Sequence, residues 1–441
     1  MGSLPDFDIA PLSSRISTVV PATPRGDENG AYQLNYMDLL MKLHYIRSVY
    51  FFNSEAVKGL SISDLKRPMF PLLDPYSHVS GRIRRSETGR PFIKCNDAGV
   101  RIAESHCDKT LQEWFRENGN SVDALVHDHV LGPDLAFSPL VFVKFTRFKC
   151  GGLSLGLSWA HVLGDGFSAF AFISKWSQIL AGEAPPKSLH MPNLPEPQIL
   201  PHSISENPHP ISIKRTNIVG EYWLATNDND VATHSFHLTS KQLHHLSNLT
   251  RDAANKAKTS FFQIISALFW KFVTIIRQNF GPQLVTICTS KSTRAENEFP
   301  TNGFLVLSKI EADFSAGKCE ISELVNLINE SKMLENHVME NLVETDEGIG
   351  DFIVYGATLT FVDLEEANFY DDGVKLNGQK PIMANCTFRG VGDQGVVLVL
   401  PAPEDNEGGG GGGSGRIVTV SLPREELDQL KDKLGGEWGI H

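Results

Sequence analysis

The segment Ser158-Trp-Ala-His-Val-Leu-Gly-Asp-Gly166 marks the point where a strand is followed by a helix. Before it, residues 153–160 alternate large apolar side chains with small ones, a period of two that is typical of a strand. Two glycines inside the segment permit a tight turn. After it, apolar side chains recur at helical spacing as far as residue 180. We therefore expect a strand, a turn that carries His161, and a buried helix that starts just after Asp165.

His161 continues the apolar parity of the strand, so its side chain is expected to point inward. An imidazole whose pKa is near ~6.5 suits a general base at cellular pH. Asp165 is expected to act on structure rather than on a proton, either by capping the following helix or by binding an Arg that fixes the loop. A second interpretation stays open, in which His161 is a satisfied core residue and Asp165 is only a helix cap.

Length, charge and cysteine content exclude several classes of protein. The 441 residues are enough for two domains with sizeable cores. The formal net charge is −12, whereas nucleic-acid binding needs a basic surface, so no nucleic-acid partner is expected. The six cysteines are scattered without Cys-x-x-Cys spacing, which indicates reduced thiols in a cytosolic setting. The sequence shows neither a signal peptide nor 18 consecutive apolar residues, so we expect no membrane span.

One short segment raises the question of a metal site. His127-Asp128-His129 places two imidazoles on one face of an extended segment. No third ligand lies nearby in the sequence, and a Gly132-Pro133 turn follows. A surface loop is therefore favoured over a metal site, and no metal is expected.

A proline-rich segment divides the chain into two halves. Residues 183–210 contain eight prolines, and prolines in that number exclude a helix or a central strand. We therefore expect an N-terminal domain over residues 1–182, a proline-rich crossover over 183–215, and a C-terminal domain over 216–441.

The C-terminal part predicts one strong helix and a flexible loop. Ser260 and Gln263 have capping-box spacing at the start of an apolar helix that ends near Gln278. Residues 408–415 are glycine-rich and indicate a flexible hairpin loop. Strands are expected near residues 358–362, 395–400 and 416–422, and a polar helix over residues 424–434.

These features resemble the BAHD acyltransferases, which use coenzyme A thioesters as acyl donors. The similarity runs along nearly the whole chain and rests on His161-Val-Leu-Gly-Asp165-Gly166, Met37-Asp38, Val79-Ser-Gly-Arg82, Cys95-Asn-Asp-Ala-Gly99, Phe148-Lys-Cys-Gly-Gly152 and the helix around Trp270. The resemblance implies an α/β (α+β) fold of two chloramphenicol-acetyltransferase-like domains with a channel between them. It also implies that His161 lies in mid-channel as the general base, with acyl-CoA as a donor substrate and no tightly bound cofactor.

The chain departs from that family at its second signature, Asp-Phe-Gly-Trp-Gly. Lys375-Leu-Asn-Gly-Gln379 stands at the matching position. The Asp of that signature pairs with an Arg in the family, and Lys291 stands where this Arg is expected. With lysines at both positions, that structural ion pair cannot form.

A narrower branch, the plant eceriferum/glossy proteins of cuticular wax synthesis, is similar in several further segments. These are residues 41–52, 128–135, 137–141, 219–224, 352–362 and 390–398. The branch is understood to modify the fatty-acid elongase of the endoplasmic reticulum. The resemblance therefore implies a ketoacyl-CoA synthase as partner, for a protein that is otherwise monomeric. It implies a location on the cytosolic face of the endoplasmic reticulum through that partner, or in the cytoplasm.

Two functions are therefore predicted as alternatives. In the first, favoured by the missing signature, the chain is an accessory protein that promotes very-long-chain acyl-CoA elongation, with His161 and Asp165 kept as fold elements. In the second, it is a working acyltransferase in which His161 deprotonates an alcohol or amine acceptor.

Overall fold

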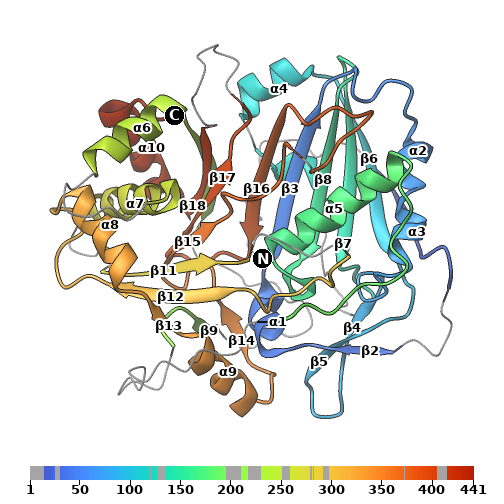
Figure 1. Ribbon diagram of the computed structural model, residues 1–441, viewed down its shortest axis with the longest axis horizontal. Coiled ribbons are helices and arrows are strands. Elements are labelled where there is room, and N and C mark those ends of the chain that lie inside the picture. Colours follow the sequence, from blue (N-terminus) through green and yellow to red (C-terminus); the bar gives the residue numbers. More distant parts are fainter. Residues whose placement is uncertain are drawn as a thin grey trace, which may run out of the picture.

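A computed structural model describes residues 14–24, 30–119, 121–127, 136–194, 210–216, 230–250, 259–278, 281, 283–291, 297–371, 373–404 and 415–441. Two mixed β-sheets lie side by side, and helices cover them (Figure 1). The α/β class predicted from the sequence is thus confirmed. No helix within the described ranges combines the length and the apolar character needed to cross a bilayer.

The first sheet contains six strands, five of them from the N-terminal half. In order across the sheet they are β1 (Ser14–Val19), β6 (Val100–Cys107), β7 (Val141–Phe148), β8 (Leu153–Ala160), β3 (Tyr45–Phe52) and β16 (Met383–Arg389). Strands β3 and β8 are buried along their whole length. Helix α5 (Gly166–Leu180) crosses this sheet in Figure 1, and its Phe172 and Trp176 are buried in the core beneath it.

The second sheet contains seven strands with helices on one face. In order they are β10 (Val231–Leu238), β18 (Arg416–Pro423), β17 (Val396–Pro401), β15 (Leu359–Asp363), β11 (Leu284–Thr289), β12 (Val306–Glu311) and β13 (Met333–Leu334). The helices that build its second core are α6 (Ser240–Leu249), α7 (Phe261–Arg277), α8 (Ile321–Glu330) and α10 (Arg424–Trp438). Figure 1 shows these four gathered at the left of the molecule.

Shorter elements lie along the chain between the strands and helices of the two main sheets. The helical ones are α1 (Tyr36–Leu40), η2 (Met41–Leu43), α2 (Ile62–Lys66), α3 (Met69–Leu73), α4 (Leu111–Asn118), η3 (Asp123–Leu125), η4 (His161–Leu163) and α9 (Asn336–Thr345). Two small sheets complete the fold, one of β2 (Ala31–Gln33), β5 (Pro91–Lys94) and β4 (Arg82–Arg85), the other of β14 (Asp351–Ile353) and β9 (Lys214–Thr216).

One strand crosses the boundary between the two expected domains. β16 comes from the C-terminal half, yet it pairs antiparallel with β3 along the edge of the first sheet. The core between the sheets also combines side chains of β8 and α5 with those of β17. The two halves are therefore joined by main-chain hydrogen bonds and by shared apolar packing.

Most elements predicted for the C-terminal half are confirmed. Helix α7 begins at the capping box formed by Ser260 and Gln263, and β15, β17 and β18 coincide with the three expected strands. Helix α10 is longer than predicted and ends at Trp438.

Two predictions concern segments that are only partly described. β17 and β18 pair antiparallel, as a hairpin requires, whereas most of the glycine-rich loop between them, residues 405–414, lies outside the described residues. The described parts of the crossover, residues 183–194 and 210–215, contain no helix, and strand β9 begins at Lys214. His190 forms a parallel bridge with Glu298.

Candidate active site

The turn after β8 places His161 in the interior, between the two sheets. β8 ends at Ala160, and His161 opens the one-turn helix η4 with its side chain fully buried. Its backbone N–H donates to the carbonyl of His44 at 3.1 Å. Gly164 has a φ of 147°, and a Cβ added there would lie 2.8 Å from the backbone nitrogen of Thr301. Glycine is therefore needed at this position, because a segment of the other half passes directly over the turn.

Asp165 holds the start of the following helix. Its Oδ1 accepts a hydrogen bond from the Ser168 backbone N–H at 2.9 Å, which caps α5. Its Oδ2 accepts a hydrogen bond from the Ser290 hydroxyl at the end of β11. The aspartate thus ties the turn to the second sheet as well as to α5.

Asn302 fixes the protonation of the His161 ring. Its Nδ2 donates to Asp38 Oδ1 at 2.9 Å and to the His161 carbonyl at 2.7 Å. Its Oδ1 lies 3.1 Å from His161 Nδ1. An amide oxygen only accepts, so Nδ1 carries the proton and Nε2 carries the lone pair.

The lone pair on His161 Nε2 accepts a hydrogen bond from Tyr355. Its hydroxyl lies 3.0 Å from His161 Nε2 and donates to it. The Tyr355 ring is buried and is held between His44, with ring centroids 4.8 Å apart, and Phe388, at 4.5 Å. A general base presents this lone pair to the acceptor hydroxyl, so Tyr355 stands where an acceptor would have to bind.

Little space remains around these groups. The cavity beside Asp165 and Tyr355, closed further by Phe388, has a volume of about 10 Å³. A single buried water needs about that much room or slightly more. Among the described residues, the implied channel is therefore closed at this point.

Burial also shifts the pKa of the ionisable groups here. Loss of solvent lowers the pKa of His161 to about 4, and that of the neighbouring His44 to about 3. Desolvation raises the pKa of Asp38 to about 7. At cellular pH the His161 ring is thus neutral, and it is a weaker base than a solvated imidazole.

The two positions of the second signature have separate contacts. The Lys375 backbone N–H donates to the Ser177 hydroxyl at 2.9 Å, and the turn that follows has positive φ at Asn377 and Gly378. The Lys291 ammonium lies 4.8 Å from the centre of the Phe304 ring. An Asn-Gly turn packed against α5 thus lies where the sequence comparison expects the Asp-Phe-Gly-Trp-Gly loop.

Sequence reasoning found His161 and Asp165 but missed Asn302 and Tyr355. These two partners lie 141 and 194 positions away from His161, respectively. No local spacing marks such contacts, so the sequence carried no signal for Tyr355.

The histidine pair weighed as a metal site lies mostly outside the described residues. His127 packs its ring 4.9 Å from that of Phe142, and residues 128–135 are outside the described ranges. Within those ranges no three His, Cys, Asp or Glu side chains are grouped to hold a metal ion.

Comparison with known proteins gives consistent matches. The Transferase family model matches residues 13–296. Protein ECERIFERUM 2 of Arabidopsis thaliana is 42% identical over 442 residues, which covers 96% of this chain and 98% of the relative.

Two solved structures are similar over almost the whole chain. Vinorine synthase has a TM-score of 0.65 at 16% identity, covering 96% of this chain and 98% of its own. TRI101 of F. graminearum, crystallised with ethyl coenzyme A, has a TM-score of 0.67 at 15% identity, covering 93% and 98%. Similarity at these identities concerns the fold, and it confirms the predicted architecture of two chloramphenicol-acetyltransferase-like domains.

Proposed function

The chain belongs to the Transferase family, that of the BAHD acyltransferases, and on that premise we propose that it is an accessory protein of the fatty-acid elongase. It acts with a ketoacyl-CoA synthase and promotes elongation of very-long-chain acyl-CoA for cuticular wax. The partner holds it at the cytosolic face of the endoplasmic reticulum. The full-length similarity to ECERIFERUM 2 supports this branch of the family over its other members.

The proposal depends on one observation: the lone pair of His161 Nε2 already accepts a hydrogen bond. Tyr355 donates to Nε2 at 3.0 Å, and the adjoining cavity of about 10 Å³ leaves no room for an acceptor molecule. Acyl transfer would require Tyr355 to move away and the acceptor to enter a site that is fully buried.

In the accessory function, His161 and Asp165 stabilise the fold. His161 joins Asn302 and Tyr355, and Asp165 joins α5 to β11. Both side chains link the N-terminal half to the C-terminal half. Buried polar groups with satisfied hydrogen bonds hold such a junction in a single arrangement.

Co-expression in yeast with a plant ketoacyl-CoA synthase tests the proposal. The variants are His161→Gln, which has no base but keeps a hydrogen-bonding side chain, and His161→Ala. With protein levels matched to wild type by immunoblot, we expect the same extension of the longest acyl chains. Loss of those chains with His161→Gln, at an unchanged protein level and melting temperature, would show that the accessory reading is wrong.

The second candidate function is acyl transfer from acyl-CoA to an alcohol or amine. The specific observation in its favour is the protonation of His161, because a proton on Nδ1 leaves Nε2 as the basic atom. The test is release of the coenzyme A thiol from long-chain acyl-CoA by purified protein. Release that depends on an added acceptor and is lost in His161→Gln supports transfer; release at the rate without protein excludes it.

A further inference from the structure

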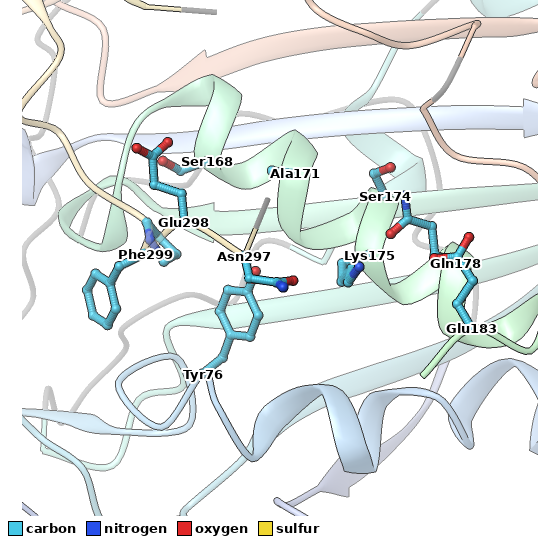
Figure 2. A pocket seen from close by; sticks show the side chains of 11 residues that line it. Tyr76, Ser168, Ala171, Ser174, Lys175, Gln178, Glu183, Asn297, Glu298 and Phe299 are labelled. Carbon is cyan, nitrogen blue, oxygen red and sulfur yellow. The ribbon is translucent and has the colours of Figure 1, made fainter. Parts of the chain in front are cut away.

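A groove lies on the side of α5 that faces away from the core. Unlike the His161 centre, it is open. It has a volume of about 270 Å³ and is lined by Ser168, Ala171, Lys175 and Gln178 of α5, by Tyr76, and by residues 297–300 (Figure 2). We call it the α5 groove. The four helical positions lie on one face of α5. From Ser168 to Gln178 the helix rises by about 15 Å, the span of four to five residues of extended chain.

Two polar groups in the α5 groove have no partner among the described residues. The Lys175 ammonium has no hydrogen bond or ion pair with any described residue. Asn297 Oδ1 is buried and has no hydrogen-bond partner among the described residues, and its residue has a φ of 57°. Figure 2 shows the Asn297 amide and the Tyr76 side chain directed toward the space in front of α5. A buried polar atom without a partner costs about 1–3 kcal/mol, so these atoms favour a ligand that donates and accepts hydrogen bonds.

Aromatic packing keeps one wall of the groove in place. Phe299 stacks on the buried His78 ring, with centroids 4.2 Å apart. Tyr76 packs edge-on against Phe172 of α5, at 5.2 Å. Both lining rings are therefore fixed from behind, and a ligand meets a wall that is already formed.

The charges of the groove alternate along its length. Figure 2 shows Glu298 at the Ser168 end and Glu183 beyond Gln178, with Lys175 between them. A complementary ligand has basic groups at both ends and a carbonyl or carboxylate in the middle. An extended polypeptide offers this order, and its main chain supplies the N–H and C=O groups that Asn297 and Lys175 need.

We propose that the α5 groove binds an extended segment of the condensing enzyme, four to five residues long, with basic side chains at its two ends. This assignment of the occupant rests on the proposed function, because the groove would be the site at which the partner attaches. Apolar side chains beside the groove extend the surface. His190 bridges to Glu298, and in the segment that follows it Met191 and Leu194 are 72% and 46% exposed. The net charge of −12 favours approach of a basic segment at long range.

Photo-crosslinking in the co-expressing yeast tests this site. p-Benzoylphenylalanine replaces Ala171, which is exposed within the groove, or Lys187, which is exposed and outside it. The expected result is a crosslink to the ketoacyl-CoA synthase from position 171 and none from position 187. Mass spectrometry of the crosslinked peptide identifies the bound segment, which should contain basic residues about four apart.

Charge reversal supplies the matched comparison. Lys175→Glu and Lys187→Glu change the net charge equally, and only the first lies in the groove. We expect Lys175→Glu to reduce the crosslink from position 171 by about tenfold, and Lys187→Glu to leave it unchanged.

The outcomes separate the docking site from the proposed function. The docking site is wrong, and the accessory function stands, if acyl chains are extended but both charge variants crosslink equally. The same conclusion follows if acyl chains are extended and position 171 gives no crosslink. A Lys175-dependent crosslink without any chain extension supports the groove and overturns the accessory function. A crosslinked segment without basic residues overturns the stated occupant.

Discussion

Two asparagines five residues apart distinguish the His161 centre from the α5 groove. Asn302, at the His161 centre, is fully buried and uses both its amide nitrogen and its amide oxygen in hydrogen bonds. Asn297, in the α5 groove, has an amide oxygen to which no described residue donates a hydrogen bond. The His161 centre thus has an asparagine whose amide is satisfied and little space, whereas the α5 groove has an asparagine with an unsatisfied oxygen among the described residues and a cavity of about 270 Å³. His161 and Asp165 therefore join the two halves of the chain, whereas the proposed binding surface lies on α5.

The largest expected effect comes from the buried ion pair that anchors the Tyr355 segment. Lys42 Nζ lies 2.9 Å from Asp351 Oδ1, with both side chains at most 2% exposed. Lys42→Ala removes the ammonium that pairs with this buried carboxylate, so the free energy of unfolding should fall by about 3–5 kcal/mol. Urea titration measures the loss. Lys58→Ala, in an exposed pair with Glu55, is the control and should cost less than about 1 kcal/mol.

Removal of Tyr355 should open the His161 centre. Tyr355→Ala creates a cavity in the core and should lower the free energy of unfolding by about 3 kcal/mol. It also frees Nε2, so diethylpyrocarbonate should modify His161 in this variant and not in wild type at pH 7. Peptide mass spectrometry reads the modification. Equal modification of both proteins would mean that Tyr355 does not protect the lone pair.

Stability should depend on pH through the buried imidazole. The pKa of His161 is about 4 in the folded protein and near ~6.5 when the chain is unfolded. The unfolded chain therefore binds a proton that the folded protein does not, and stability is lost as the pH falls from about 6.5 toward 4. At pH 5 the loss is about 2 kcal/mol.

His161→Gln isolates this contribution, because other buried groups such as His44 and Asp38 still titrate in the variant. Unfolding of wild type and His161→Gln is compared at pH 7 and pH 5. Between pH 7 and pH 5, the free energy of unfolding of wild type should fall by about 2 kcal/mol more than that of His161→Gln. An equal fall in both proteins means that His161 is not desolvated in the folded protein.

The smallest expected change in the free energy of unfolding is an increase, and it comes from a residue of the α5 groove. Asn297→Gly removes a buried oxygen without a partner and fits the positive φ, at some cost in chain entropy. The free energy of unfolding should rise by about 0.5–1 kcal/mol, whereas Asn302→Gly should lower it. A fall with Asn297→Gly would show that this amide is satisfied and that the contrast between the two regions is smaller than described.

The sequence predicted most of the secondary structure that positions the site. The alternation through residues 153–160 is β8, and the capping box at Ser260 starts α7. Both signals lie within a few consecutive residues, where backbone preferences and local hydrogen bonds decide the conformation. The long-range contacts of the site were beyond such signals, since Asn302 and Tyr355 reach His161 from another half of the chain.

By itself, then, the sequence determined the family, the two-sheet architecture and the turn that presents His161 and Asp165. The tertiary structure decided whether His161 has a free lone pair, whether a channel is open beside it, and where polar groups are left without partners. The physical reason is that alternation, capping and turns depend on neighbouring residues. Burial, pKa and cavity volume depend instead on side chains that only packing brings together.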